Sequence, residues 1–298
     1  MREEAEPGAG RDRGTEYAAA TEEGIVVVDG TPIHYLRAGT GPAVVLIHGA
    51  SANLGDMSFD LLPRLARHHS VVAFDRPGHG SSGWPARGGE QLAHQARMLR
   101  AALSSLGHDR AIVAGHSYGG AVALSWALEM PASVTGLLLL GAPSQGWNGG
   151  MGMGNDLLAH PLTAPYFSWA LPAMMTRSIL DRRIEELFAP QRPPSGLVAH
   201  VSPRKIFAPE TLRANAVQLM ALKRQLLAMV PRYPGLRMPV EILHGTEDAV
   251  VPIEFHAERL AAAVPGARLT PLPGVGHMPH HVVPREVEFA LARLVAAG

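Results

Sequence analysis

The sequence contains no cysteine among its 298 residues. This absence excludes disulfides, thiolate nucleophiles and metal sites built from cysteine, and it leaves the redox environment of the protein open. Net charge is lacking as well, because 26 basic residues balance 26 acidic ones. A neutral chain gives no electrostatic reason to expect nucleic acid or an anionic membrane as a partner, and we predict neither.

Long apolar runs are also missing. No stretch approaches the ~18 residues of a membrane-spanning helix, and Leu137–Leu140 has the length of a buried strand. Residues 1–23 are charged, rich in Gly and Ala, and without the apolar segment that is typical of a secretory signal. We therefore expect a disordered tail over residues 1–23 and a cytoplasmic protein.

What the sequence does contain is an apolar run, Ile112–Ala114, that leads into Gly115-His116-Ser117-Tyr118-Gly119 and then into helix-forming residues. This GxSxG pattern is typical of a tight strand-to-helix turn, in which glycines avoid clashes between Cβ atoms and the backbone. The turn exposes the Ser117 hydroxyl at a helix N-terminus, where the backbone N–H of Tyr118 and the helix dipole favour developing negative charge. Ser117 is therefore a candidate nucleophile.

A serine hydroxyl needs a base to activate it, and the base needs an acid to orient it. Asp248 follows the apolar run 240–244 and is the candidate acid, since the GxxD spacing favours it over its neighbour Glu247. His277 follows the run 268–272 in a GxGH sequence and is the candidate base. The chain order Ser, Asp, His differs from the orders of the chymotrypsin and subtilisin triads.

With two further motifs, these segments resemble the serine hydrolases of the α/β-hydrolase fold over roughly residues 24–298. Val44–Ser51 is similar to the family's strand and HG turn, and Phe74–Ser82 is similar to its DxxGxGxS loop. The resemblance implies an α/β fold with an eight-stranded, mostly parallel sheet whose second strand is antiparallel, flanked by helices. It also implies an oxyanion hole formed by the backbone N–H groups of Ala50 and Tyr118.

Short apolar runs alternate with helix-forming segments along the chain, which independently indicates a doubly wound, mostly parallel sheet. In such sheets the loops at the carboxyl ends of the strands build the site. The predicted strands are Ile25–Val28, His34–Arg37, Ala43–Ile47, Val71–Asp75, Ala111–Ala114, Leu137–Leu140, Val240–His244 and Arg268–Leu272, and the predicted helices include Phe59–Arg67, Gln91–Leu106, Tyr118–Glu129, Ile253–Val264 and Arg285–Ala296.

The alternation stops between Gly141 and Met238, a span too long for an ordinary crossover. The resemblance implies a helical cap over the active site here. We predict a core of residues 24–143 and 237–298 and a cap of residues 144–236. Apolar cap residues are predicted to bind substrate or, alternatively, to pack the cap onto the core. These residues are Trp147, Met151 and Met153, with Tyr166, Phe167, Trp169, Met174 and Met175 as further candidates.

A metal site is an alternative of a different chemical class. His277, His280 and His281 are clustered, but the sequence has no HExxH motif and no carboxylate at ligand spacing beside them. We therefore predict no metal and no other cofactor. Asp56 and Asp75 are assigned structural or loop roles.

These residues predict a serine hydrolase. His277 takes the proton of Ser117 during attack on an acyl carbonyl, and Asp248 orients the imidazole. A serine in the elbow excludes the epoxide hydrolases and haloalkane dehalogenases of this fold, which use Asp there. The preferred substrate is a small-molecule ester of a small to medium apolar acid, because the predicted cap is rich in Met, Trp and Pro.

Several alternatives on the same fold stay open. A C–C hydrolase of ring-cleavage dienones needs cationic or amide groups for the substrate carboxylate, for which Asn53, Arg182, Arg183 and Arg213 are candidates. A perhydrolase or haloperoxidase-like enzyme, a proline-specific aminopeptidase and a ligand receptor that keeps the triad are the others. The oligomeric state is also left open by the sequence.

Overall fold

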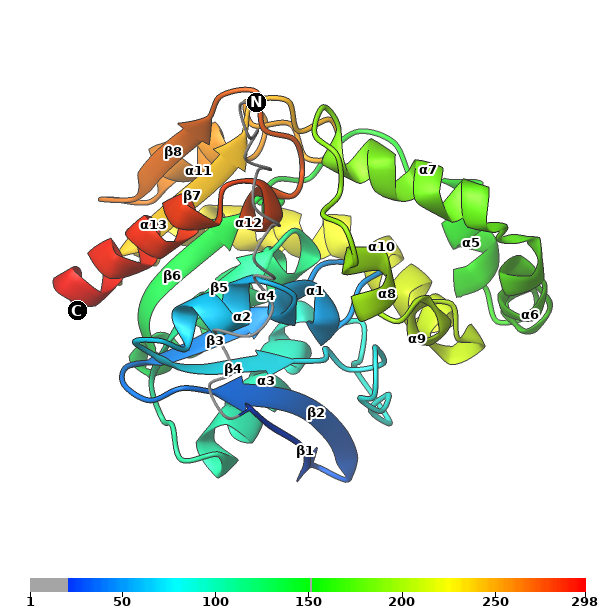
Figure 1. The fold of residues 1–298 in the computed structure, drawn as a ribbon, viewed down its shortest axis with the longest axis horizontal. Coiled ribbons are helices and arrows are strands. Elements are labelled where there is room, and N and C mark those ends of the chain that lie inside the picture. Colours follow the sequence, from blue (N-terminus) through cyan, green and yellow to red (C-terminus); the bar gives the residue numbers. More distant parts are fainter. Residues whose placement is uncertain (1–20, 151) are drawn as a thin grey trace, which may run out of the picture.

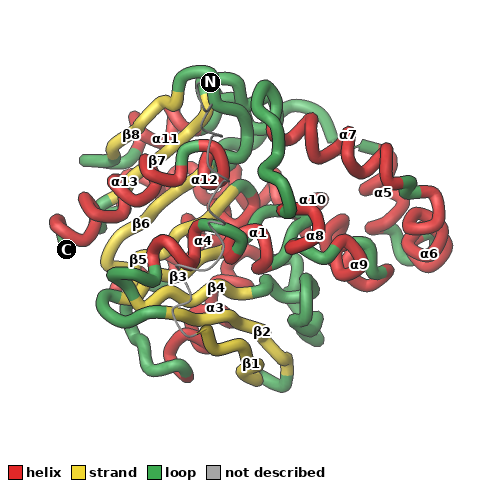
Figure 2. Tube along the Cα trace, viewed as in Figure 1, coloured by secondary structure: helices red, strands yellow, loops and turns green. Residues whose placement is uncertain are grey.

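The structure is a computed structural model that describes residues 21–150 and 152–298 (Figures 1 and 2). One sheet contains eight strands in the order β1-β2-β4-β3-β5-β6-β7-β8. Strand β2 is antiparallel to both of its neighbours, and the remaining pairs are parallel, which confirms the predicted fold class. The strands are β1 (Thr21–Val28), β2 (Thr31–Ala38), β3 (Ala43–Ile47), β4 (Ser70–Phe74), β5 (Ala111–His116), β6 (Val134–Leu140), β7 (Val240–Gly245) and β8 (Arg268–Leu272).

Strand β1 begins earlier than predicted, inside the segment assigned to a disordered tail. Residues 21–23 pair with residues 36–38 of β2. Glu22 also accepts hydrogen bonds from the Tyr35 hydroxyl and from the Arg37 guanidinium. These partners lie on another strand and have no local signal in the sequence. The rest of the predicted tail, residues 1–20, lies outside the described residues.

Helices cover both faces of the sheet, and this explains why its inner strands are apolar on both sides. In β3, Val45 and Ile47 belong to one core layer, and Val44 and Leu46 belong to the other. The first layer packs on α3 (Leu92–Ser105), α4 (Tyr118–Glu129) and α11 (Ala257–Ala263), and the second packs on α1 (Leu54–Ser58), α2 (Leu61–Leu65) and α13 (Pro284–Ala297).

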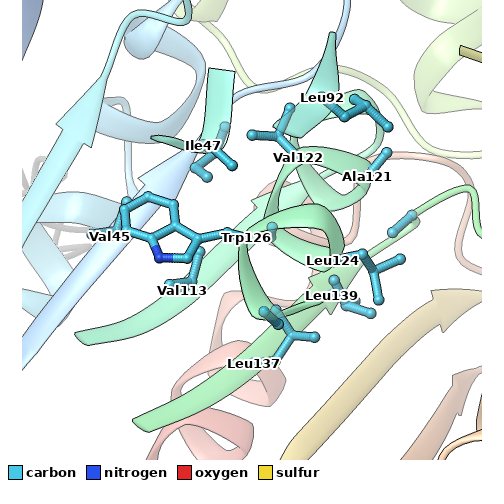
Figure 3. Packing of buried hydrophobic residues seen from close by; sticks show 14 of the residues in the cluster. Val45, Ile47, Leu92, Val113, Ala121, Val122, Leu124, Trp126, Leu137 and Leu139 are labelled. Carbon is cyan, nitrogen blue, oxygen red and sulfur yellow. The ribbon is translucent and has the colours of Figure 1, made fainter. Parts of the chain in front are cut away.

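Helix α4 is held on the sheet by Trp126, a fully buried side chain. Figure 3 shows its indole beside Val45 and Val113, on the face of the sheet that α4 covers. Its Nε1 donates to Ser133 Oγ at 2.9 Å, so the polar atom of the ring is satisfied inside the core. Burial of a side chain of this size contributes roughly 4 kcal/mol of transfer free energy. The anchoring of α4 fixes the helix that begins directly after Ser117.

The segment between β6 and β7 forms a helical insertion, most of which lies to the right of the sheet in Figure 1. Its long helix α10 buries Leu222, Leu226 and Met229 in the first core layer. No helix in the described parts of the chain is long and apolar enough to cross a membrane. The insertion contains α5 (Met153–Ala159), α6 (Ala164–Met174), α7 (Arg177–Phe188), α8 (Leu197–His200), α9 (Pro203–Ile206), α10 (Pro209–Met229) and the 3-10 turn η2 (Val230–Gly235), and outside it lie the 3-10 turn η1 (Pro131–Ser133) and α12 (Pro279–Val282).

Candidate active site

Ser117 occupies the turn between β5 and α4 in a left-handed conformation, with φ of +50°. This conformation is strained for a residue with a side chain, at a cost of about 1–3 kcal/mol. The turn is close-packed: a Cβ on Gly115 would lie 2.3 Å from the Gly119 oxygen, and a Cβ on Gly119 would lie 2.2 Å from the Ile47 oxygen. The Ser117 N–H donates to Leu140 O at 2.9 Å. The glycines thus permit the nucleophile elbow that the sequence predicted.

Three loops at the carboxyl ends of β5, β7 and β8 bring Ser117, Asp248 and His277 together. His277 Nε2 lies 3.0 Å from Ser117 Oγ, and His277 Nδ1 lies 2.7 Å from Asp248 Oδ2. A carboxylate can only accept a hydrogen bond, so it holds the proton of a neutral imidazole on Nδ1. The lone pair of Nε2 is then directed at the serine hydroxyl, as a general base requires.

Asp248 is held by four groups. Its Oδ1 accepts hydrogen bonds from the backbone N–H groups of Val250 and Val251, at 2.9 and 2.8 Å. His277 Nδ1 and, at 3.3 Å, His244 Nε2 lie beside its Oδ2. Burial raises the pKa of the Asp248 carboxyl, but hydrogen bonds from His244 and His277 outweigh it and hold that pKa well below its usual range. The acid is therefore ionised at neutral pH. His244 was not predicted, and its only sequence signal is its place four residues before Asp248.

The two predicted oxyanion donors lie beside Ser117. Ala50 and Tyr118 line the same cavity as Ser117. Tyr118 is the first residue of α4, so its N–H has no acceptor within the helix. Their role as donors to an oxyanion stays a prediction.

A buried cation, Arg76, contacts both the turn that precedes Ala50 and the side chain of Tyr118. The Arg76 guanidinium donates to the backbone oxygens of His48 and Gly49, at 3.1 and 3.0 Å, and to Gln218 Oε1 at 2.6 Å. It also stacks on the Tyr118 ring, with its central carbon 4.3 Å from the ring centroid. Burial lowers the pKa of Arg76 to about 10, so the group stays cationic at neutral pH. Sequence analysis placed Arg76 in the DxxGxGxS loop but assigned it no role.

A cavity of about 1060 Å³ opens over Ser117 and His277, between the sheet and the helical insertion. Trp147 lines it, as the sequence predicted. Sequence analysis missed the lining from α7 and α10, because helical periodicity does not show which face of a helix points toward a cavity. The apolar lining includes Leu180, Ile184, Leu187, Leu212, Leu219 and Leu222.

Other predicted lining residues lie elsewhere. The prediction for Met153 was wrong, because its side chain is 76% exposed at the start of α5 and does not line the cavity. Met151 lies outside the described residues. Of the further candidates, Met175 does line the cavity, whereas Tyr166, Phe167, Trp169 and Met174 are exposed and do not.

Comparison with known proteins agrees with this architecture. Residues 42–284 match the family model described as the alpha/beta hydrolase fold. An uncharacterised protein of Mycobacterium tuberculosis (strain ATCC 25618 / H37Rv) is 31% identical over 255 residues, which cover 82% of this chain and 72% of that protein. The 2-hydroxy-6-oxo-6-phenylhexa-2,4-dienoate hydrolase of Burkholderia cepacia is 27% identical over 252 residues, which cover 82% of this chain and 84% of that protein.

A solved structure shows the same fold at lower identity. The 2-hydroxy-6-oxo-6-phenylhexa-2,4-dienoate hydrolase from Rhodococcus sp. strain RHA1 superposes with a TM-score of 0.77 over 94% of this chain and all of that one, at 22% identity. The elbow, the order of the site residues and the eight-stranded sheet therefore agree with the family match. The chain belongs to the alpha/beta hydrolase fold family, and the hydrolases among its relatives support a hydrolase activity.

Proposed function

We propose that the protein is a serine hydrolase that cleaves carboxylic esters of small to medium apolar acids through an acyl-enzyme on Ser117. The observation that carries the proposal is the unbroken chain of hydrogen bonds from Ser117 Oγ to His277 (3.0 Å) and from His277 to Asp248 (2.7 Å). A serine, a neutral imidazole and an ionised carboxylate in this order are the parts that acyl transfer needs.

The steps follow from these positions. His277 Nε2 takes the proton of Ser117 as Oγ attacks the acyl carbonyl, and the backbone N–H groups of Ala50 and Tyr118 stabilise the oxyanion. The imidazolium, stabilised by Asp248, then gives its proton to the leaving alcohol. A water molecule, deprotonated by His277 in the same way, attacks the acyl-enzyme and releases the acid.

The cavity favours an apolar acyl group. Its lining is mainly aliphatic and aromatic, and its volume is of the size that encloses small molecules. Arg183 lines the cavity, but its guanidinium pairs with Glu186 at 2.9 Å, and Glu186 is also in the lining. The carboxylate neutralises this cation, so the pair does not favour a second, anionic group on the substrate.

A C–C hydrolase is the second candidate, favoured by the two observations that named relatives hydrolyse dienoates and that Arg183 faces the cavity. Of the other groups considered for a substrate carboxylate, Asn53 is engaged, because its Oδ1 accepts from Gly55 N and its Nδ2 donates to Val201 O. Arg182 and Arg213 do not line the cavity. We therefore prefer the ester.

Hydrolysis of p-nitrophenyl esters from acetate to palmitate tests the proposal. We expect multiple turnovers by the wild type, with a preference for short and medium chains. Ser117→Ala is expected to reduce kcat by roughly 10³- to 10⁶-fold. Ser105→Ala is the matched control, because Ser105 is exposed at the end of α3 and does not line the cavity. Retention of a tenth of the activity by Ser117→Ala would remove Ser117 from the mechanism.

The same preparations separate the two candidates. The dienone 2-hydroxy-6-oxo-6-phenylhexa-2,4-dienoate loses its absorbance when its C–C bond is cleaved. A folded wild type that leaves every ester intact but bleaches the dienone supports the second candidate. A folded wild type that turns over neither substrate contradicts both.

A further inference from the structure

Three buried polar side chains that the triad does not use converge beside Ser117, and two of them, Asp56 and His116, line the same cavity. They are Asp56 of α1, His116 at the end of β5 and His280 of α12, with exposed fractions of 4%, 4% and 0%. Asp56 Oδ2 lies 3.3 Å from His280 Nε2 and 3.8 Å from His116 Nδ1, and the three atoms all lie within 4.8 Å of one another. None of these atoms has a hydrogen-bond partner among residues 21–150 and 152–298. We call these three residues the Asp56 cluster.

Because of the way His116 is protonated, its contact with the Asp56 carboxylate is unfavourable unless a positive charge lies between the two groups. His116 Nε2 lies 2.9 Å from the backbone oxygen of His277, which can only accept, so Nε2 carries the proton. The other ring nitrogen, Nδ1, then presents a lone pair to the Asp56 carboxylate. Two electron-rich atoms that face each other in a buried site lose their hydration without gaining a partner. A cation between them satisfies both.

The donor set and its geometry are those of a transition-metal site. Two imidazole nitrogens and one carboxylate oxygen are common zinc ligands, and bonds of 2.0–2.2 Å in a tetrahedron separate neighbouring ligand atoms by about 3.4 Å. The distances of 3.3 and 3.8 Å within the cluster lie on either side of that value. We propose that Asp56, His116 and His280 bind one divalent transition-metal ion, of which zinc is the best match.

The outer contacts of His116 and Asp56 fit this assignment, whereas Nδ1 of His280 has no hydrogen-bond partner among the described residues. Metal-binding histidines usually donate their second ring N–H to a carbonyl or carboxylate, and bound carboxylates are hydrogen-bonded in turn. His116 donates to the His277 backbone, and the second oxygen of Asp56 accepts from His281 Nε2 at 2.9 Å. Sequence analysis rejected a metal because no carboxylate stood near the C-terminal histidines. The fold supplies that carboxylate from α1.

The ion would link α1 to the two segments that carry Ser117 and His277. His116 directly precedes Ser117, and His280 follows His277 by three residues. A metal that binds only the folded chain therefore stabilises the relative positions of the nucleophile loop and the base loop. It takes no part in acyl transfer, because the hydrogen bonds from Ser117 to Asp248 are complete without it. Metal binding at the Asp56 cluster is therefore independent of whether the substrate is an ester.

Metal analysis of tag-free protein tests the site. After incubation with zinc and extensive dialysis, we expect one tightly held Zn²⁺ per chain by mass spectrometry. Asp56→Asn and His280→Gln should each weaken zinc binding by more than about a hundredfold, because even changes to the outer partners of a metal site cost 10- to 100-fold. His68→Gln is the matched control, since His68 is exposed at the end of α2 and outside the cluster. Far-UV circular dichroism checks that each variant is folded.

X-ray absorption spectroscopy of the wild-type protein keeps the test independent of the variants. The zinc spectrum should show two imidazole ligands at about 2.0–2.1 Å with one or two further oxygen ligands. Zinc that dialysis removes, or a spectrum without two imidazoles, overturns the proposal. So does zinc that folded Asp56→Asn and His280→Gln retain as tightly as the wild type, because exposed histidines then hold it.

Discussion

Replacement of Asp248 by Asn gives the sharpest test of the site, because the contacts of Asp248 dictate how the new amide must lie. The backbone N–H groups of Val250 and Val251 both point at Oδ1. An amide oxygen accepts both hydrogen bonds, whereas an amide NH₂ in that position would place donors against donors. The Asn oxygen therefore takes the Oδ1 position, and its NH₂ group faces His277 Nδ1.

The consequence is a change of tautomer in His277. An NH₂ group 2.7 Å from Nδ1 donates to it, so the imidazole proton moves to Nε2, which faces Ser117 Oγ. A protonated Nε2 cannot accept the serine proton. In another fold with the same three groups, this change costs about 10⁴-fold in kcat, or ~5.4 kcal/mol at 1.36 kcal/mol for each factor of ten. We expect a loss of the same order here.

The assay is kcat/KM for the best p-nitrophenyl ester, measured beside Glu247→Gln. Glu247 is the adjacent exposed acid, so the control removes one negative charge without touching His277. We expect the control to stay within about twofold of the wild type, because exposed charges contribute little. An Asp248→Asn variant that is folded and keeps more than a tenth of the activity would refute the assignment of Asp248 as the orienting acid.

Three further predictions concern the scaffold. Gly119→Ala should lower the free energy of unfolding, measured in urea, by roughly 3 kcal/mol or more, because the added Cβ would lie 2.2 Å from the backbone oxygen of Ile47. Gly235→Ala is the control, because a Cβ there has no atom within 4 Å and should leave the free energy of unfolding unchanged. Leu139→Ala should lose about 2–5 kcal/mol in the same assay. The hydrogen bond to Asp75 raises the pKa of His34. The His34–Asp75 interaction therefore stabilises the fold fully below the pKa of His34 in the unfolded chain, about 6.5, and this stabilisation is lost as the pH rises through the higher pKa of the folded state. In thermal melts at several pH values, the Tm of the wild type should approach that of His34→Gln as the pH rises. A Tm difference that is the same at every pH would contradict this.

The strands and the triad were predictable because each rests on a local pattern. An apolar run between turn residues marks a strand, and the nucleophile elbow needs glycines at fixed positions around Ser117. Helix bounds were less accurate. The predicted helix Phe59–Arg67 is observed as the shorter α2 (Leu61–Leu65), and the preceding helix α1 (Leu54–Ser58) was not predicted. The start of α1 does have a local signal, since Asn53 caps it by accepting a hydrogen bond from Gly55 N.

The groups that surround the triad were not predictable from motifs: the partners of Arg76 and Asp56 are distant in sequence, and the spacing of four residues between His244 and Asp248 does not by itself indicate a contact. His244, Arg76 and Asp56 are ordinary residue types in ordinary loops and strand ends. Each acquires its role only when the fold brings a partner to it. His244 meets the Asp248 carboxylate, Arg76 meets the backbone oxygens of His48 and Gly49, and Asp56 meets the ring nitrogen of His280. Motif spacing contains no information on such contacts.

The base loop shows how the substrate cavity and the catalytic machinery are connected. Gln191, which follows α7 in the helical insertion, accepts a hydrogen bond from Gly276 N at 3.1 Å and donates to Gly274 O. A Cβ on Gly276 would lie 2.0 Å from Ala189 O, so the two segments are in direct backbone contact. His277 is the next residue. The position of His277 therefore depends on the segment that follows α7, because the loop that carries His277 shares hydrogen bonds with that segment.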